Sequence, residues 1–275
     1  MRRLGLIGSG GMAATVLTVL AANLPVPLDH VSLLTRPGSR DAAAALLAGA
    51  GPRLAVATAV RTDLPAFLAD DPHAVVECAG HGAVRAYGAA VLERGRDLIM
   101  ISTGSLADEA LRIELACAAR RGGARLTLPP GAVGGIDALV AARLSGLKEV
   151  VYIGRKPPAA WRGTPAERLL DLDALTAPAG FFEGSAREAA RDYPQNANVA
   201  APVALAGAGF DATRVRLVAD PGIVRNVHEV SVRSACADFT IRLEGHPSPA
   251  NPKTSLTAGH SIAREVLNRV ASLVI

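Results

Sequence analysis

A glycine-rich segment near the start of the chain has the composition and spacing of a phosphate-binding turn. It runs Gly8-Ser9-Gly10-Gly11-Met12-Ala13 and fits the pattern G-x-G-x-x-A. In such a turn Gly8 makes the tight bend, Gly10 lets backbone N–H groups approach a pyrophosphate, and Ala13 allows close helix–strand packing. The pyrophosphate then lies at a helix N-terminus, where N–H groups and the helix dipole favour an anion. We therefore expect the cofactor contacts to include Gly8, Ser9, Gly10, Gly11 and Met12.

The residues around this segment bear on two other interpretations. An apolar run, residues 4–7, precedes the glycines and a helix-compatible run, residues 12–24, follows them; this is the context that the pattern requires. A tight turn between any strand and helix is one alternative. A secretory signal is the other, because Arg2 and Arg3 precede an apolar stretch, but four glycines between positions 5 and 11 would weaken a signal helix.

The end of the next predicted strand, residues 30–35, addresses the choice of cofactor. In NAD-specific sites an acidic residue at this point binds the ribose hydroxyls, and here the chain continues Thr35-Arg36-Pro37-Gly38-Ser39-Arg40. Arg36, with Ser39 and Arg40, could instead hold a 2′-phosphate. A solvent-exposed arginine before a Pro-Gly turn is the alternative. The sequence favours a site that accepts NADP, with NAD as the other candidate.

One histidine in the second half of the chain is a candidate for proton transfer. His228 lies in the run 226–233, whose alternation predicts a strand with His228, Val230 and Val232 on one face. Histidine is the side chain best suited to proton transfer near neutral pH. A histidine on an apolar face is also often a core residue, so both interpretations stay open.

Polar residues near two predicted helix starts could contact a ligand. Asn198 is expected to open a helix, residues 198–206, where an N-cap is the simpler role. Lys253 and Thr254 precede a predicted C-terminal helix, and with its N-terminus they could form a carboxylate cradle. Capping and solvent exposure are the alternative roles of this pair.

The elements that must position these residues follow two patterns. Up to residue 128, strands predicted at 4–7, 30–35, 53–60, 74–78, 97–102 and 125–128 alternate with helices, which indicates a parallel sheet. Ligands bind beyond the carboxyl ends of such strands. The loops at 79–82 and 102–105 end two strands there, so we expect Ala79 to contact the cofactor and His81 to lie nearby.

The pattern changes at the proline- and glycine-rich segment 129–135. Longer strands are predicted at 149–153, 214–219, 226–233 and 238–243, with helices at 165–170, 185–191 and 198–206. The predicted fold class is α/β: a Rossmann dinucleotide-binding domain, residues 1–130, and a C-terminal α/β domain with a mostly antiparallel sheet, residues 131–254. The second domain is expected to bind substrate and dimerise. An amphipathic helix, residues 255–275, should pack back on the first domain.

The composition limits the classes of protein and partner. Half of the residues are hydrophobic but only 3% are aromatic, so the core must consist of alanine, valine and leucine, and no apolar run reaches the ~18 residues that span a bilayer. The net charge of +4 comes from scattered arginines; this favours anionic small molecules and gives no support to a nucleic-acid partner. Cys78, Cys117 and Cys236 lack metal-site spacing, so we expect reduced thiols in a cytoplasmic protein with no metal.

Seven segments of the sequence resemble the L-aspartate dehydrogenase family over nearly the full length. The last four of them, in chain order, are specific as a set, because a generic Rossmann enzyme would not carry them all. The seven are GLIGSGGMA at 5–13, VVECAGHGAV at 75–84, STGSLAD at 102–108, PPGAVGGIDAL at 129–139, YPQNANVAA at 193–201, ADPGIVRNVHEV at 219–230 and NPKTS at 251–255.

This resemblance implies an activity and a set of site residues. The family oxidises L-aspartate with NAD or NADP to iminoaspartate, which yields oxaloacetate and ammonia, and its members are usually homodimers. By motif, His228 matches the active-site histidine, and Ala132 and Asn198 match nucleotide contacts. On this basis Asn198 would fix the nicotinamide ribose or the substrate, and Lys253 and Thr254 would hold one carboxylate.

The resemblance has one departure and leaves two alternatives. At Cys78-Ala79-Gly80-His81, family members tend to have small residues followed by serine or a similar polar group, so the resemblance assigns no role to His81. A related Rossmann reductase, such as dihydrodipicolinate reductase or homoserine dehydrogenase, is the nearer alternative. A regulatory protein that binds NADP without turnover is the more distant one.

Overall fold

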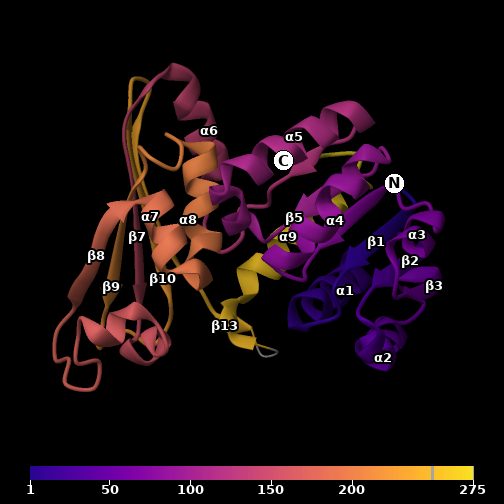
Figure 1. Ribbon diagram of the computed structural model, residues 1–275, viewed down its shortest axis with the longest axis horizontal. Helices are drawn as coiled ribbons and strands as arrows, with labels where there is room; N and C mark the ends of the chain where they lie inside the picture. The colour runs from indigo at the N-terminus through magenta and orange to yellow at the C-terminus, as the bar shows by residue number, and fades with distance from the viewer. Residues whose placement is uncertain (249–250, 275) are drawn as a thin grey trace. The chain divides into compact units, whose positions relative to one another are not determined.

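The chain divides into two compact units, each described here by itself. The computed structural model describes residues 1–248 and 251–274, apart from the side chains of residues 195–198 and 251–254. Unit 1 comprises Met1–Pro129 and Ala258–Ile275, and unit 2 comprises Pro130–Thr257 (Figure 1).

Unit 1 is built on a six-stranded sheet in which every neighbouring pair is parallel. The order is β3-β2-β1-β4-β5-β6, which confirms the predicted Rossmann arrangement. The chain order reverses between β1 and β4, and ligands bind at such a switch point. The strands are β1 (Arg3–Ile7), β2 (Leu28–Leu34), β3 (Ala55–Arg61), β4 (Ala74–Glu77), β5 (Asp97–Met100) and β6 (Leu126–Thr127).

The helices of unit 1 alternate with these strands. Their buried faces consist mainly of alanine, valine and leucine, as the low aromatic content requires. A fully buried aromatic ring, Phe67, packs over Gly5 of β1, where a Cβ would lie 2.4 Å from the ring. The helices are α1 (Gly11–Asn23), η1 (Pro37–Ser39), α2 (Arg40–Ala50), α3 (Leu64–Ala69), α4 (His81–Glu93), η2 (Thr103–Ala107), α5 (Glu109–Gly122) and α9 (Leu256–Asn268).

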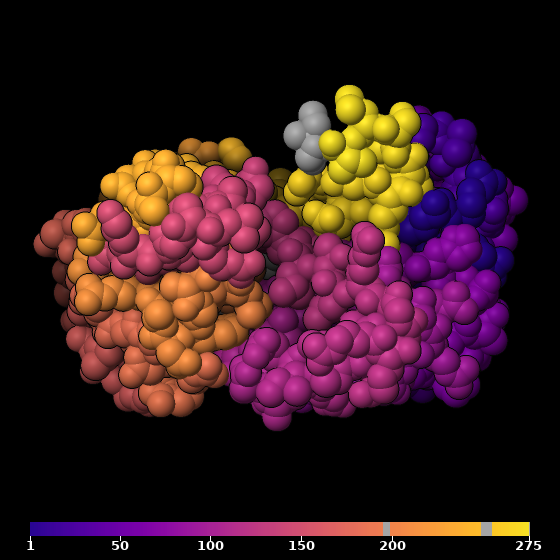
Figure 2. Space-filling view, turned by 90° about the horizontal axis from the view of Figure 1, so that it is seen from above, coloured from indigo at the N-terminus to yellow at the C-terminus, as the bar shows by residue number. Residues whose placement is uncertain are grey.

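The last helix, α9, packs into the core of unit 1. Its buried side chains Ile262, Ala263 and Val266 join the apolar cluster formed by β1, β2 and α1. Figure 2 shows this C-terminal segment, in yellow, against the indigo N-terminal segment. Beyond the helix, the guanidinium of Arg269 pairs with Asp97 at the start of β5. Apolar burial and this ion pair therefore attach the last helix and the residues after it to the sheet of unit 1.

Unit 2 is an α/β layer with a five-stranded sheet in the order β11-β10-β7-β9-β8. All neighbouring pairs are antiparallel except β7 and β9, which are parallel. The predicted mostly antiparallel sheet is thus confirmed. The three α-helices of the unit lie on one face of the sheet (Figure 1). The strands are β7 (Leu147–Lys156), β8 (Ala179–Ser185), β9 (Arg214–Ala219), β10 (Val227–Ser234) and β11 (Asp238–Glu244), and the helices are α6 (Ile136–Ser145), α7 (Ala186–Asp192) and α8 (Pro194–Ala206).

Several local expectations for unit 2 are wrong. Helix α8 begins at Pro194, so Asn198 lies inside it and is not its N-cap; proline suits the first position of a helix because its φ is already helical. Strand β8 was not anticipated. Residues 165–170 form only a 3-10 turn, η4 (Pro165–Arg168), although Thr164 does cap it as expected.

Lys253 and Thr254 belong to a short strand that the sequence did not predict. This strand, β13 (Asn251–Ser255), pairs with β12 (Pro247–Ser248). Helix α9 follows directly and begins at Leu256. The side chains of Lys253 and Thr254 lie outside the described residues. A second short element, η3 (Pro158–Trp161), follows β7.

The packing of α9 against α1 can be tested at Gly259. A Cβ there would lie 2.6 Å from Cγ2 of Thr15 in α1, and both residues are held in helices. We expect Gly259→Ala to lower the free energy of unfolding by about 1–3 kcal/mol, as overpacking does. The matched control is Gly49→Ala in α2, where nothing lies within 4 Å of the new Cβ; it should raise stability by about 0.5–1 kcal/mol. Urea unfolding measures the free energy of unfolding of both variants. Equal values for Gly259→Ala and Gly49→Ala would contradict this account of the packing.

Candidate active site

The turn after β1 depends on a glycine at position 8. Gly8 has φ +108°, a conformation that side-chain-bearing residues rarely adopt. A Cβ at Gly8 would lie 3.0 Å from Cβ of Ala79 and 3.1 Å from the carbonyl of Cys78. The backbone N–H of Gly8 also donates to the carbonyl of Leu34 at 2.9 Å. The turn therefore approaches the ends of both β2 and β4, which no larger residue would allow.

The N-terminus of α1 opens beside this turn. Gly10 is the N-cap, no side chain caps the helix, and its first turn holds no acidic residue. Nothing lies within 4 Å of the place that a Cβ of Gly10 would occupy. Gly11 and Met12 form the first helical turn, and Ala13 is fully buried behind it. Exposed N–H groups at a helix N-terminus stabilise an anion, so the turn fits a pyrophosphate.

A cleft of about 630 Å³ lies over the carboxyl ends of β1, β2 and β4. Its size is typical of small-molecule sites. No carboxylate is among the described residues that line it. Four of the small residues predicted to contact the cofactor line it, namely Gly8, Ser9, Gly10 and Ala79. His81 is not part of the lining; it is the first residue of α4, where the sequence suggested a loop.

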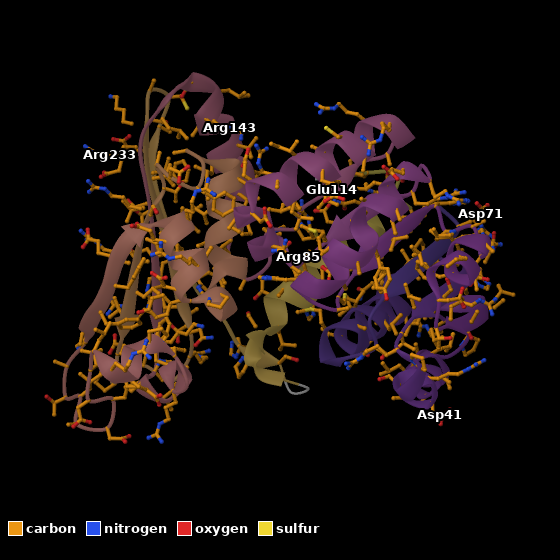
Figure 3. All side chains as sticks on the ribbon, viewed as in Figure 1. Asp41, Asp71, Arg85, Glu114, Arg143 and Arg233 are labelled. Carbon is orange, nitrogen blue, oxygen red and sulfur yellow. The ribbon has the colours of Figure 1, made fainter. Side chains whose placement is uncertain are left out.

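The cleft carries a cation where NAD-specific sites carry an acid. Arg36 follows β2, is exposed, and lines the cleft together with Ser39. Arg40 does not line it. The acidic residue of the first turn of α2, Asp41, is exposed on that helix (Figure 3) and does not line the cleft. Ser9 and Thr35 connect the glycine turn to this strand end through their hydroxyls, 2.9 Å apart.

A buried carboxylate beside the cleft was missed in the sequence. Glu77 ends β4 and is 1% exposed. Its Oε1 accepts from the N–H groups of Ala79 and Gly80, both at 2.7 Å, and Oε2 accepts from the N–H of Ser102 at 3.2 Å. Burial raises the pKa of Glu77, and these hydrogen bonds oppose the rise. The carboxyl thus ties the loop after β4 to the segment after β5; an acid in an otherwise apolar strand was the signal that could have found it.

His228 lies on the covered face of the unit 2 sheet. In β10 the burial of His228, Val230 and Val232 follows the predicted alternation. Its neighbours across the sheet are Gly154 of β7 and Leu243 of β11. The side chain is 3% exposed. His228 is therefore surrounded by strands on both sides.

The ring of His228 is held by a buried tyrosine. Nδ1 lies 2.9 Å from the hydroxyl oxygen of Tyr152, which is also buried. The two rings are nearly parallel, at 17°, with centroids 6.1 Å apart. This pairing joins residues 76 positions apart, and the sequence analysis did not anticipate Tyr152.

Burial and a neighbouring cation set the protonation of His228. Burial, together with the positive charge of Lys156, lowers the pKa of His228 to about 4. Burial also lowers the pKa of Lys156 to about 8, and its Nζ lies 5.0 Å from the centroid of Trp161. His228 is therefore neutral near pH 7 and keeps a lone pair that can accept a proton.

The other predicted residues of unit 2 occupy different elements. Ala132 is 8% exposed, in the turn before α6. This turn packs closely, because a Cβ at Gly135 would lie 1.7 Å from Ile241. Asn198 lies on α8, and its side chain is outside the described residues. Among the residues that are described, no cluster of three or more His, Cys, Asp or Glu could hold a metal ion, and no helix is long and apolar enough to cross a membrane.

The fold and the cleft define the class of protein. A parallel sheet in the order 3-2-1-4-5-6, a glycine turn at its switch point and an uncapped helix N-terminus together make a Rossmann dinucleotide-binding protein with a second, mixed-sheet unit.

Comparison with known proteins identifies the family within this class. Residues 8–129 match the model of the homoserine dehydrogenase NAD-binding domain, and residues 137–269 match that of the aspartate dehydrogenase C-terminal domain. The L-aspartate dehydrogenase of Polaromonas sp. is 46% identical over 100% of both chains, and that of Ruegeria pomeroyi is 46% identical over 98% of this chain and 94% of its own. The solved aspartate dehydrogenase of Thermotoga maritima has 26% identity and a TM-score of 0.75 over 100% of this chain and 99% of that one. The chain belongs to the L-aspartate dehydrogenase family, and its cofactor is a nicotinamide dinucleotide.

Proposed function

We propose that the chain oxidises L-aspartate with NAD or NADP to iminoaspartate, which water converts to oxaloacetate and ammonia. The observation that carries this proposal is the 46% identity to an L-aspartate dehydrogenase over the whole of both chains, which covers the glycine turn and His228 alike. A panel of L-aspartate, L-homoserine and other amino acids, followed by the absorbance of the reduced nicotinamide, tests it. Absence of any aspartate-dependent signal would contradict the proposal.

Different residues of unit 1 are proposed to bind different parts of the cofactor. Gly8, Gly10 and the first turn of α1 would hold the pyrophosphate, and Arg36 a 2′-phosphate. Ala79 would lie along the cofactor in the cleft. When bound, the nicotinamide supplies the oxidising chemistry, and the protein supplies orientation and electrostatics. Ala132 and Asn198 are proposed as further nucleotide contacts, on the strength of their motifs.

His228 is proposed as the base of the reaction. The amine of the substrate must lose a proton before it can be oxidised, and a neutral imidazole can accept that proton. The same residue can later help water add to the imine. Lys253 and Thr254 are proposed to hold one carboxylate of the substrate.

We expect Arg36 to decide the preference between NADP and NAD. A charge-assisted contact contributes about 1.5–3 kcal/mol, so Arg36→Ala should raise the KM for NADP about tenfold or more and leave the KM for NAD little changed. Arg40→Ala is the matched control, because Arg40 does not line the cleft. Steady-state kinetics with both cofactors measure this. Equal effects on NADP and NAD would remove Arg36 from the 2′-phosphate site.

We expect His228→Ala to lower kcat by about 10²–10⁴-fold, the usual contribution of a positioned base. Dinucleotide affinity should hold, because the glycine turn belongs to unit 1. In the wild type, kcat/KM should fall on acidification near pH 4 rather than 6.5, because the pKa of His228 is lowered to about 4; the variant should lack this limb. A folded variant with kcat within a few-fold of wild type would leave His228 as a core residue only.

The same lowered pKa sets the sign of a stability control. The unfolded chain protonates His228 at its ordinary pKa of 6.5, before the folded chain does. Acidification from pH 6.5 to 4 should therefore lower the unfolding free energy of the wild type by about 3 kcal/mol. His228→Ala lacks the imidazole, so its unfolding free energy should not show this decrease. Melting temperatures at pH 7 and pH 5 report it.

We propose that the chain is a homodimer formed through the sheet of unit 2. The sheet face opposite the helices carries half-buried Val151 and Ile153, and Arg233 points away from the helices (Figure 3). Light scattering at micromolar concentration should give the mass of a dimer, and Ile153→Glu should give a monomer that still binds dinucleotide, because an unpaired charge buried in the contact is costly. A monomeric wild type would contradict the proposal.

A further inference from the structure

The pairing of Tyr152 with His228 is built by three residues on two strands. Tyr152 and Gly154 lie on the same face of β7, and Gly154 is directly opposite His228 of β10. The tyrosine hydroxyl therefore reaches past Gly154 to Nδ1, at 2.9 Å. Both side chains are buried, so the contact is shielded from water.

Gly154 leaves the space that the hydroxyl occupies. A Cβ at this position would lie 2.8 Å from Oη of Tyr152 and 3.2 Å from Cδ2 of Leu217. Any other residue would push the hydroxyl away from His228. A glycine inside a central strand weakens that strand, so its presence here accords with the room that the hydroxyl needs.

The hydroxyl of Tyr152 can donate to a bare Nδ1 or accept from Nδ1–H, and only the second arrangement leaves the lone pair on Nε2. A neutral imidazole carries one proton, and the partner of one nitrogen sets which nitrogen carries it. We propose that Tyr152 is a positioning residue for His228: its hydroxyl oxygen accepts from Nδ1–H, so that Nε2 presents the lone pair that takes the substrate's proton. This inference rests on the proposed role of His228 as base.

The surroundings keep Tyr152 a neutral hydroxyl. Burial raises its pKa, so it is not a phenolate at neutral pH. Among the described residues, the titratable groups near His228 on this face are Tyr152 and Lys156, and neither is a carboxylate that could hold the ring instead. The two rings are nearly parallel, at 17°, so the hydroxyl meets Nδ1 close to the plane of the imidazole.

Two variants break the contact in different ways. Tyr152→Phe removes the hydroxyl and keeps the ring, and Gly154→Ala keeps the hydroxyl but displaces it. We expect each to lower kcat about tenfold, the equivalent of one neutral hydrogen bond, with the KM for L-aspartate and the Kd for NADPH within twofold of wild type. Gly180→Ala on β8 is the control, because nothing lies within 4 Å of the new Cβ; its kinetics should match wild type.

A spectroscopic measurement separates positioning from simple packing. In protein labelled with 15N-histidine, the chemical shifts of His228 should show Nδ1 protonated and Nε2 unprotonated in the wild type, and should move towards Nε2 protonation in Tyr152→Phe. The signal is assigned by its loss in His228→Asn. Protonation on Nε2 in the wild type, or unchanged kcat in both contact-breaking variants, would overturn the inference. The wild-type spectrum tests it even where a variant does not fold.

The failure of this inference differs from failure of the proposed base. Full activity in His228→Ala would remove His228 from the reaction whatever its tautomer. An inactive His228→Ala beside a fully active Tyr152→Phe would overturn only the positioning role of Tyr152.

Discussion

The close approach of backbone at Gly8 is the constraint on which the cofactor unit depends. With φ at +108° and Ala79 and Cys78 within about 3 Å of any Cβ, the position admits glycine alone without strain. That approach brings the end of β1 against the end of β4, and the cleft opens over the two. Gly10, the N-cap of the uncapped helix α1, lines this cleft.

The cleft is also shaped by a carboxylate that never meets solvent. Glu77 loses hydration when it is buried, which raises its pKa, but three backbone N–H groups and the hydroxyl of Ser102 replace the lost water. Breaking such a set costs more than the set contributes, because a buried acceptor would be left unpaired. These hydrogen bonds hold the loop after β4, and Ala79 lines the cleft as part of that loop.

In unit 2, burial lowers the pKa of a titratable group, whereas in unit 1 it raises the pKa of Glu77. A histidine removed from water loses its charged form, so the pKa of His228 falls to about 4, with Lys156 adding to the effect. A group near 6.5 would be partly protonated at neutral pH, whereas this one is neutral; the same lowered pKa makes it a weaker base. The cost appears as sensitivity to acid, since the unfolded chain binds that proton more readily.

Some features of this protein follow from local sequence. The glycine turn, the alternation of strands and helices up to residue 128, and the alternation around His228 each depend on residues close together in the chain, because strand and helix periods are local properties. Arg36 could be placed after β2 for the same reason. The start of α8 was misjudged because Pro194 and Asn198 both carry helix-start signals, and local rules do not rank them.

Only the tertiary structure decided which distant residues meet. The contacts between Gly8 and Ala79 and between Tyr152 and His228 join neighbouring strands that are not consecutive in the chain. The contact between Glu77 and Ser102 joins consecutive strands, but it too links residues 25 positions apart. No pattern in a single strand specifies its neighbour, because pairing is set by the packing of whole layers. The sequence by itself determined that a dinucleotide turn and a buried histidine exist; the sheet order determined which groups hold them.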